Sequence, residues 1–343
     1  MEFGFYLPCY WPDVRVPAQK MYAEMLEEAK LAEDIGLISL TIPEHHFVNY
    51  LVHPSPLLTA VHVAAVTKRI PLISAVLVLP FYDMRRLAGE IAQADCLTDG
   101  RIQLGVGRGA FRYEFDRFGV PVEESRERFD DSLNLLIKLL SETEVSWQSK
   151  YYDFAPLTIT PRPVQKPYPP IWIAALNQHA IEGCARRGFH VMTTPLRDPI
   201  EAVKMQATAF RAAKLPGPPG AQRLSMLRMG YVARDEADTR DKVALAYANH
   251  RRFVNVFTTP GTVTDGAILP VDVSETPNDI RRNLIVGTPQ ECVDKLGIYA
   301  ELGIDDIQIN MNFGTQHRDV MASLERLATH VIPHFAKSAA AGG

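Results

Sequence analysis

Residues 71–110 read PLISAVLVLPFYDMRRLAGEIAQADCLTDGRIQLGVGRGA, and they contain a strand, a helix and a second strand. Leu72–Leu79 is almost wholly apolar and rich in β-branched residues, which is typical of a strand buried on both faces of a parallel sheet. Met84–Leu97 has apolar residues at helical spacing and ends before Asp99-Gly100, after which Ile102–Val106 forms the next strand. This order predicts a βαβ unit within a parallel sheet.

The same alternation continues on both sides of this unit. Further strands are predicted at Phe3–Leu7, Ile38–Ile42, Ile171–Ala174, Phe189–Met192, Ser225–Val232 and Asp306–Asn310. Further helices are predicted at Tyr22–Ile35, Pro56–Thr67, Ser125–Leu140, His179–Arg187, Glu201–Ala213, Glu236–Phe257, Pro289–Leu302 and Asp319–Phe335. Eight strands in a βα rhythm favour an α/β fold of the (β/α)8 type, a TIM barrel, over the alternative of a doubly wound open sheet. We expect one barrel domain over residues 1–337 and a disordered tail at 338–343.

Two segments exceed the minimal barrel. Thr143–Pro170 is polar, aromatic and proline-rich, and it is predicted to form an insertion before the fifth strand. Thr258–Arg282 contains Gly and Pro without any periodicity, and it forms a second insertion before the last βα unit. Because long loops in compact domains are usually functional or mobile, the second insertion is a candidate lid.

Composition narrows the class of protein. Of the 343 residues, 47% are hydrophobic and 22% are charged, as in ordinary globular proteins. The net charge of −4 provides no basic field for nucleic acid or an acidic membrane, and the longest apolar run, Ile70–Phe81, is too short to span a bilayer. Four cysteines without a CxxC spacing indicate reduced thiols and a cytoplasmic protein.

Active-site residues of a barrel follow its strands, and Glu44-His45-His46 after the second strand is the sharpest polar cluster. A histidine beside a carboxylate can transfer protons near neutral pH. Neighbouring residues of an extended chain point to opposite sides, so the two histidines cannot easily bind one metal ion, and no metal site is predicted. We expect one histidine to be functional and the other to have a structural role.

The fourth strand ends in the glycine-rich segment Gly105–Gly109, with the sequence GVGRG. Its glycines let the backbone approach a flat or charged ligand, and Arg108 can donate two hydrogen bonds to a phosphate. The segment lacks the GxGxxG spacing of a dinucleotide-binding fold, and no apolar helix follows it. The alternative interpretation is a glycine turn with a solvated arginine.

Two further residues are candidates for phosphate binding. Asn177 is placed to cap the helix after the fifth strand, and a helix N-terminus at a strand end is a natural phosphate site. Arg126, near the start of the fourth helix, could reach the same region. The alternative for Arg126 is a surface ion pair with Glu123 or Asp130.

Two helices carry small residues at three- and four-residue spacing, which permits close helix packing. These residues are Ala60, Ala64 and Ala65 in one helix and Ala88, Gly89 and Ala92 in the next. The helices are predicted either to pack a second subunit in a homodimer or to pack against neighbouring helices of the same barrel.

Several motifs, taken in order along most of the chain, carry a specific resemblance. They are FGFYL at 3–7, EHHF at 44–47, AVLVLP at 75–80, DGRIQLGVGRGAFRYEFDRFG at 99–119, PPIWIAALNQHA at 169–180 and VGTPQECVDKL at 286–296. The chain resembles the bacterial luciferase-like flavin monooxygenases, and within them the luciferase α subunit.

The resemblance implies a barrel that binds reduced FMN at its carboxyl-terminal mouth and receives it from a separate flavin reductase. Oxygen would add at the flavin C4a to give a peroxide that oxidises a small organic substrate. His45 corresponds to the catalytic histidine of the family, with Glu44 beside it near the flavin. The FMN-binding residues implied by the resemblance are Ala75 and Val76, joined by a cis peptide, and Gly107, Arg108, Arg126, Ala174, Ala175, Asn177 and Gln178.

The expected substrate pocket has aromatic walls. Its residues are Trp11, Phe47, Tyr82 and Phe111. Gly107 stands where luciferase has a reactive cysteine, which puts aldehyde-dependent light emission in doubt. The alternatives are a deazaflavin-dependent dehydrogenase on the same barrel, a non-catalytic flavin-binding protein and a metal-dependent barrel hydrolase.

Overall fold

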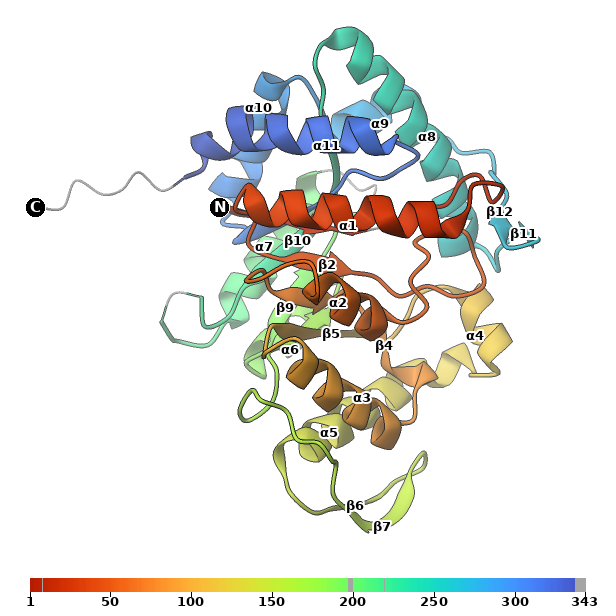
Figure 1. The fold of residues 1–343 in the computed structure, drawn as a ribbon, viewed down its shortest axis with the longest axis vertical. Helices are drawn as coiled ribbons and strands as arrows, with labels where there is room; N and C mark the ends of the chain where they lie inside the picture. The colour runs from red at the N-terminus through yellow and green to blue at the C-terminus, as the bar shows by residue number, and fades with distance from the viewer. Residues whose placement is uncertain (8, 197–199, 219, 337–343) are drawn as a thin grey trace, which may run out of the picture.

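The computed structural model describes residues 1–7, 9–196, 200–218 and 220–336 of the chain, and these residues form a closed barrel of eight parallel strands (Figure 1). The barrel strands, in order around the barrel, are β1 (Glu2–Tyr6), β2 (Leu40–Ile42), β3 (Leu72–Ser74), β5 (Ile102–Gly107), β8 (Ile171–Ala174), β9 (His190–Thr193), β10 (Leu224–Val232) and β14 (Asp306–Asn310). Because β14 pairs with β1, the sheet is closed. The prediction of a TIM barrel is confirmed, and the open-sheet alternative is wrong.

Helices surround the barrel, as the alternation predicts (Figure 1). Their bounds are α1 (Ala18–Asp34), α2 (Pro56–Ala64), α3 (Met84–Leu97), α4 (Arg112–Phe118), α5 (Ser125–Ser141), α6 (Gln178–Arg186), α7 (Ile200–Ala213), α8 (Glu236–Thr258), α9 (Pro277–Asn283), α10 (Pro289–Glu301) and α11 (His317–Arg326). The tail expected at 338–343 lies outside the described residues. Within the described part of the chain, no helix is both long enough and apolar enough to cross a membrane.

Two elements that the pattern predicts as continuous are interrupted. The single strand predicted at Leu72–Leu79 is divided into β3 and the short β4 (Leu77–Val78), because the chain leaves the ladder at the cis peptide bond between Ala75 and Val76. The single helix predicted at Asp319–Phe335 ends as α11 at Arg326 and continues as a π-turn and a 3₁₀-turn. Pro333, which has no N–H to donate, lies in the 3₁₀-turn.

Both predicted insertions are present, and each contains strands that the sequence pattern does not reveal. The insertion before β8 holds the hairpin β6 (Val145–Gln148) and β7 (Asp153–Leu157). The insertion after α8 holds the hairpin β11 (Val263–Thr264) and β12 (Ala267–Ile268), followed by α9. After α9, β13 (Ile285–Gly287) pairs with the end of β10. The strands of the second insertion have only two or three residues, too few for a period of two to show.

A polar layer fills the lower part of the barrel lumen. The Gln308 amide donates to the Ser39 hydroxyl at 2.9 Å and to Asp306 at 2.9 Å. Gly4 makes room for this layer, since a Cβ there would lie 2.2 Å from the Gln308 amide oxygen. The lumen at this level is therefore filled by side chains, which leaves the carboxyl-terminal mouth as the place for a ligand.

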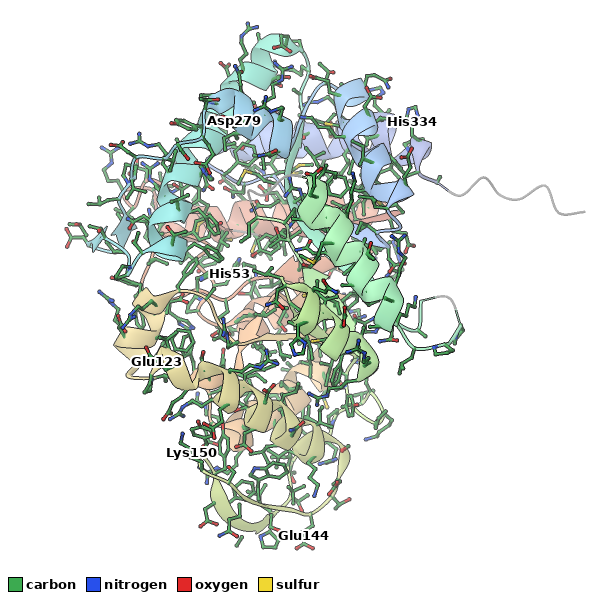
Figure 2. All side chains as sticks on the ribbon, turned by 180° about the vertical axis from the view of Figure 1, so that it is seen from behind. His53, Glu123, Glu144, Lys150, Asp279 and His334 are labelled. Atoms are coloured by element: carbon green, nitrogen blue, oxygen red, sulfur yellow. The ribbon has the colours of Figure 1, made fainter. Side chains whose placement is uncertain are left out.

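A buried histidine fixes the chain that follows β1. His53 is fully buried, near the centre of the molecule (Figure 2), and its Nε2 lies 2.9 Å from the Leu7 carbonyl oxygen. Burial lowers the pKa of His53 to about 4, so its ring is neutral near pH 7. The charged residues Glu123, Lys150 and Asp279 lie on the outside of the molecule (Figure 2).

The helices α1 and α11 are joined by a charged histidine. His317 contacts Glu28 through Nδ1 and Glu27 through Nε2, each at 3.0 Å. The bond to Glu28, above all, raises the pKa of His317 from 6.5 to about 9, and burial raises the pKa of Glu28. This bridge holds the first and last helices of the barrel together.

We expect the stability contributed by His317 to be lost at high pH. Since the pKa of His317 is higher in the folded chain than in the unfolded chain, its contribution is complete below pH 6.5 and disappears as pH rises through about 9. The melting temperatures of the wild type and His317→Gln should differ most near about pH 6 and converge near about pH 10. A difference that does not change with pH would contradict this expectation.

Candidate active site

Glu44, directly after β2, is buried and fully hydrogen-bonded. One carboxylate oxygen accepts from the Val78 N–H at 3.1 Å and from the Tyr82 hydroxyl at 2.8 Å. The other oxygen lies 2.8 Å from Nε2 of His46. Glu44 is 3% exposed, so it connects three segments of the mouth and has no accessible face. The carboxylate of Glu44, which is next to His45 in the sequence, therefore contacts His46 instead.

The partner of His45 is Glu114, from α4. Nδ1 of His45 lies 3.0 Å from the Glu114 carboxylate, which also accepts the backbone N–H of His46 at 2.7 Å. The His45 ring stacks on Phe111 with centroids 4.3 Å apart and planes 17° apart. Glu114 is 1% exposed, so it is a buried carboxylate that fixes the orientation of the His45 ring.

Glu114 is the site residue that the sequence analysis missed. No helix was expected over 110–119, because the segment is aromatic and charged instead of amphipathic, yet Arg112–Phe118 forms α4. Glu114 in the first turn of this helix was the available signal, since the motif AFRYEF places one acid among aromatic residues that must be buried.

The two histidines point apart, as expected for neighbours in an extended chain. His45 contacts Glu114, whereas His46 contacts Glu44 and meets the ring of Phe118 edge-on at 4.8 Å. Among the described residues there is no group of three or more His, Cys, Asp or Glu side chains that could hold a metal ion. The geometry thus gives each histidine its own carboxylate, Glu114 for His45 and Glu44 for His46.

Small residues form a floor beside this pair. The peptide bond between Ala75 and Val76 is cis, as the resemblance implies. A Cβ on Gly107 would lie 2.5 Å from Cγ2 of Val76 and 3.6 Å from the Cβ of Ala174, so the glycine allows Val76 to pack directly on β5. Ala174 is exposed and Ala175 is buried below it. Such a floor can carry a flat ring.

Two candidate phosphate ligands lie at the edge of the mouth. Arg108 is exposed, and its guanidinium has no hydrogen-bond or ion-pair partner in the described part of the chain. Asn177 caps α6, as predicted, by accepting the Ala180 N–H at 2.9 Å. Gln178 follows it and donates to Glu182 at 2.8 Å.

Arg126 is the candidate that the structure places least favourably. Its side chain is exposed and lies 3.0 Å from Asp130, the surface pair that the sequence left open as an alternative. Burial raises the pKa of Cys184 in α6 to about 11, and the charge of Arg126 opposes this rise, so Arg126 lies near that helix. Binding a phosphate would require it to leave Asp130.

The four aromatic residues expected to line the substrate pocket have different neighbours in the structure. Phe111 covers His45, and Tyr82 is bonded to Glu44. Phe47 is 50% exposed and packs on Phe118 with ring centroids 5.1 Å apart. Trp11 lines a cavity of about 570 Å³ between α1 and the residues before α11.

The hairpin β11–β12 packs on the mouth, on the same side of the molecule as α4 (Figure 1). Asn49, in the segment after β2, joins the hairpin to the mouth. Its backbone N–H donates to the Gly266 carbonyl at 2.7 Å, and its side-chain oxygen accepts the Ile268 N–H at 3.0 Å. Ile268 lies in one apolar cluster with Tyr50 and Phe111. The second insertion therefore covers the residues around His45.

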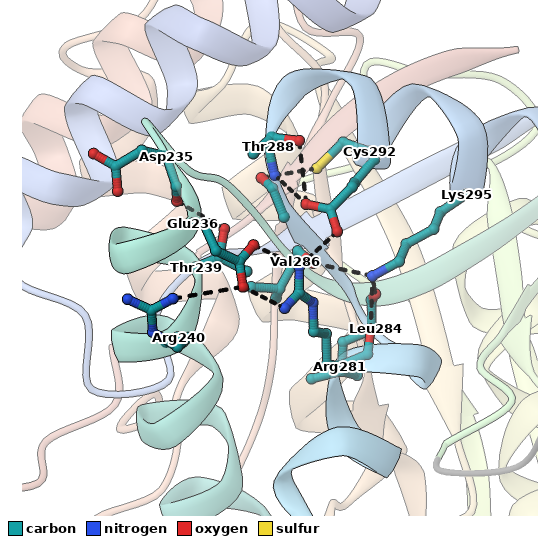
Figure 3. Close-up of polar contacts among 12 residues, drawn as sticks. Asp235, Glu236, Thr239, Arg240, Arg281, Leu284, Val286, Thr288, Cys292 and Lys295 are labelled. Atoms are coloured by element: carbon teal, nitrogen blue, oxygen red, sulfur yellow. Dashed lines mark hydrogen bonds and ion pairs between the residues drawn. The ribbon is translucent and has the colours of Figure 1, made fainter.

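The far end of this insertion is fixed by ion pairs (Figure 3). Arg281 in α9 donates to Glu236 at the start of α8, at 2.6 and 2.8 Å, and to Glu291 in α10 at 2.7 Å. Lys295 donates to the carbonyls of Arg281 and Leu284 at 2.7 and 2.9 Å (Figure 3). Helix α9 is thus held against the barrel. The hairpin is held by Asn49, by apolar packing and, at its base, by Asn255 of α8, whose side-chain N–H donates to the Thr262 and Leu269 carbonyls at 2.9 and 2.8 Å.

Residues 1–306 match the model of the luciferase-like monooxygenase family. The chain belongs to this family. A curated relative, the oxygenase component of the flavin-dependent trigonelline monooxygenase of Acinetobacter baylyi, is 29% identical over 93% of this chain and 91% of its own length. The family membership inferred from the motifs is therefore confirmed.

Solved structures share the same barrel. Monooxygenase RslO1 from Streptomyces bottropensis is 27% identical, with a TM-score of 0.84 over 98% of this chain and 100% of that one. An F420-dependent secondary alcohol dehydrogenase has a TM-score of 0.75 at 16% identity, over 98% of this chain and 99% of its own. This second likeness concerns the fold alone.

Proposed function

We propose that this member of the luciferase-like monooxygenase family is the oxygenase of a two-component system. It would use reduced FMN, supplied by a separate flavin reductase, and O2 to oxidise a small organic substrate. The observation that carries the proposal is the His45–Glu114 pair after β2, at the carboxyl-terminal mouth that also holds the small residues Ala75, Gly107 and Ala174. The Acinetobacter relative, named as a flavin-dependent oxygenase component, supports both the flavin and the reductase.

The residues present fit FMN. Small side chains at Ala75 and Gly107 would lie against a flat ring, and Ala174 and Ala175 would lie along its edge. Arg108 and the N-terminus of α6, capped by Asn177, would bind the phosphate through a guanidinium and backbone N–H groups. Gln178 would add a side-chain contact, and Arg126 a second charge.

Bound reduced FMN would supply two electrons, so that one atom of O2 enters the substrate and the other leaves as water. His45, held by Glu114, would transfer protons on the substrate side. Glu44 would act by fixing Tyr82 and the backbone at Val78. Phe111 and the hairpin β11–β12 would keep water away, and the hairpin would act as a lid that opens at Asn49.

Trp11 and Phe47 would guide the substrate into the mouth from its rim.

We also propose a homodimer through α2 and α3. Ala60, Ala88 and Ala92 are buried within this chain, which agrees with packing inside the barrel. The same helices expose Leu58 and Leu97, at 73% and 58%, which are available for a second subunit.

Mixing anaerobic protein with reduced FMN and then admitting O2 tests the proposed function. We expect a transient species whose spectrum differs from those of reduced and oxidised FMN, and which decays faster when a substrate is added. Return to oxidised FMN at the rate of free FMN, whatever substrate is present, would count against the oxygenase. Transfer of hydride from a reduced deazaflavin to a ketone without O2 uptake would favour the dehydrogenase alternative.

Arg108→Ala is expected to weaken FMN binding by about tenfold or more, because a charge-assisted hydrogen bond contributes about 1.5–3 kcal/mol. Fluorescence titration with FMN measures the effect, and riboflavin, which has no phosphate, should bind both proteins equally. Arg86→Ala on α3 removes the same charge from a surface pair with Glu90 and serves as the control. Equal FMN affinities of Arg108→Ala and the wild type would exclude Arg108 from the phosphate site.

A further inference from the structure

Tyr6 points into the barrel lumen at the level of the mouth. It is the last residue of β1, two positions after Gly4, whose Cβ would lie against Gln308 and Ser39 in the polar layer. Since side chains two positions apart on a strand share a face, Tyr6 lies directly above this layer. Its register partner on β2 is Thr41, after which the chain leads to His45.

Tyr50 approaches the same place from the segment after β2. Its ring centroid lies 5.8 Å from that of His45, 5.9 Å from Phe253 and 6.1 Å from Tyr10. Tyr6 and Tyr50 belong to one apolar cluster, so both phenols face the aromatic surroundings of His45.

Neither phenolic hydroxyl has a hydrogen-bond partner in the described part of the chain, although Tyr6 is only 5% exposed and Tyr50 only 8%. Tyrosine hydroxyls in buried places normally find a partner. Neither oxygen is among the polar atoms that are sealed from solvent without a partner, so each still reaches solvent-accessible space. Each hydroxyl is therefore a donor without a partner among the described residues.

Both hydroxyls remain protonated donors at ordinary pH. Burial raises the pKa of Tyr6 and of Tyr50 well above the usual value, and the nearby Tyr50 raises the pKa of Tyr6 further. Burial raises the pKa of Tyr10, and the charge of Arg252 in α8 opposes this rise, so Arg252 lies close to Tyr10. Arg252 has no carboxylate partner among the described residues. The surroundings therefore offer two neutral donors and one positive charge.

We propose that the hydroxyls of Tyr6 and Tyr50 form a donor subsite that binds an acceptor oxygen of a flat aromatic substrate beside His45. The acceptor is a carbonyl or a carboxylate, and the rings of Phe111 and Phe253 form the walls. The subsite rests on the proposed function, because it places a substrate at the histidine assigned to proton transfer. Sites built around such donors strongly reject analogues that lack the acceptor.

Three probes of similar shape test the subsite on the FMN-loaded protein: benzoate, acetophenone and ethylbenzene. Titration followed by ligand-observed NMR gives their affinities for the wild type, Tyr6→Phe and Tyr50→Phe. We expect the wild type to bind at least one oxygen-bearing probe about tenfold more tightly than ethylbenzene, and each Phe variant to lose about threefold to thirtyfold of that affinity. The affinity for ethylbenzene should not change. Preference for benzoate over acetophenone would identify the acceptor as a carboxylate, and the reverse as a carbonyl.

Tyr151→Phe is the matched control. Tyr151 lies in the β6–β7 hairpin, and its hydroxyl is bonded to Glu127 of α5. The subsite is refuted if the wild type binds ethylbenzene as tightly as both oxygen-bearing probes. It is also refuted if the probe affinities are unchanged in both Phe variants. The wild-type comparison holds even if a variant fails to fold. Oxygen reactivity of bound reduced FMN is measured separately. If bound reduced FMN does not react with O2 as expected while the probe preference persists, the proposed reaction is refuted and the proposed subsite stands.

Discussion

His45→Ala is expected to bind FMN as the wild type does and to lose turnover by about 10²–10⁴-fold, the usual contribution of a positioned acid or base. The His45 ring is held on one side by the Glu114 carboxylate at 3.0 Å and on one face by Phe111 at 4.3 Å. Its remaining nitrogen, Nε2, is the one left to exchange a proton with a substrate. Because the floor at Gly107 and the candidate phosphate ligands do not contact His45, FMN affinity should be retained.

The effect is measured as substrate oxidised per FMN consumed in single-turnover reactions, together with the dissociation constant for FMN. His62→Ala, at an exposed position on α2, is the control for a histidine away from the mouth. Turnover of His45→Ala at the wild-type rate would mean that the histidine has no role in proton transfer. Loss of FMN binding would instead mean that the variant has disturbed the floor.

Glu114→Gln should have a smaller effect of a different kind. An amide at this position can still contact Nδ1 of His45 and the N–H of His46, but it has no negative charge to favour the proton on Nδ1. We therefore expect a lower kcat, an unchanged KM and a shifted pH profile. These readouts identify a positioning residue, since simple loss of structure would not move the pH profile.

The barrel could be predicted from the sequence because its signal is repeated. Each barrel strand, such as Ile171–Ala174, is a short apolar run followed by a helix, and a local error at one element does not change the count. The interruption at Ala75-Val76 could not be derived from periodicity, because an apolar run looks the same whether or not it stays in the ladder. Only the resemblance pointed to it.

The candidate site was predicted less completely, because a contact that defines it joins residues far apart in the sequence. The sequence shows Glu44 next to His45, but the carboxylate that orients His45 is 69 residues further along the chain. Contacts of that separation depend on how α4 folds back on the mouth, and a seven-residue helix of aromatic and charged residues has no clear period. The cap at Asn177 was predictable because it joins residues only three positions apart.

Gly105→Ala is expected to lower the free energy of unfolding by at least about 3 kcal/mol, the upper end for overpacking in a core. A Cβ at this position would lie 1.7 Å from the Ser74 carbonyl oxygen and 3.1 Å from Sδ of Met192. The Ser74 hydroxyl donates to the Gly105 carbonyl at 2.8 Å, so β3 and β5 are joined at this point and cannot easily separate. Gly107→Ala should cost less, because its Cβ would meet the side chain of Val76 at 2.5 Å instead of backbone.

Gly89→Ala in α3 is the matched control, since a Cβ there meets nothing within 4 Å. It should stabilise the chain by about 0.5–1 kcal/mol, because alanine loses less backbone entropy in a helix. We therefore expect urea denaturation to rank the three variants, from most to least stable, as Gly89→Ala, Gly107→Ala and Gly105→Ala. Equal midpoints for Gly105→Ala and the wild type would show that β3 and β5 can move apart. In that case the glycines do not hold the floor at Ala75-Val76 in place, and the flavin site needs another explanation.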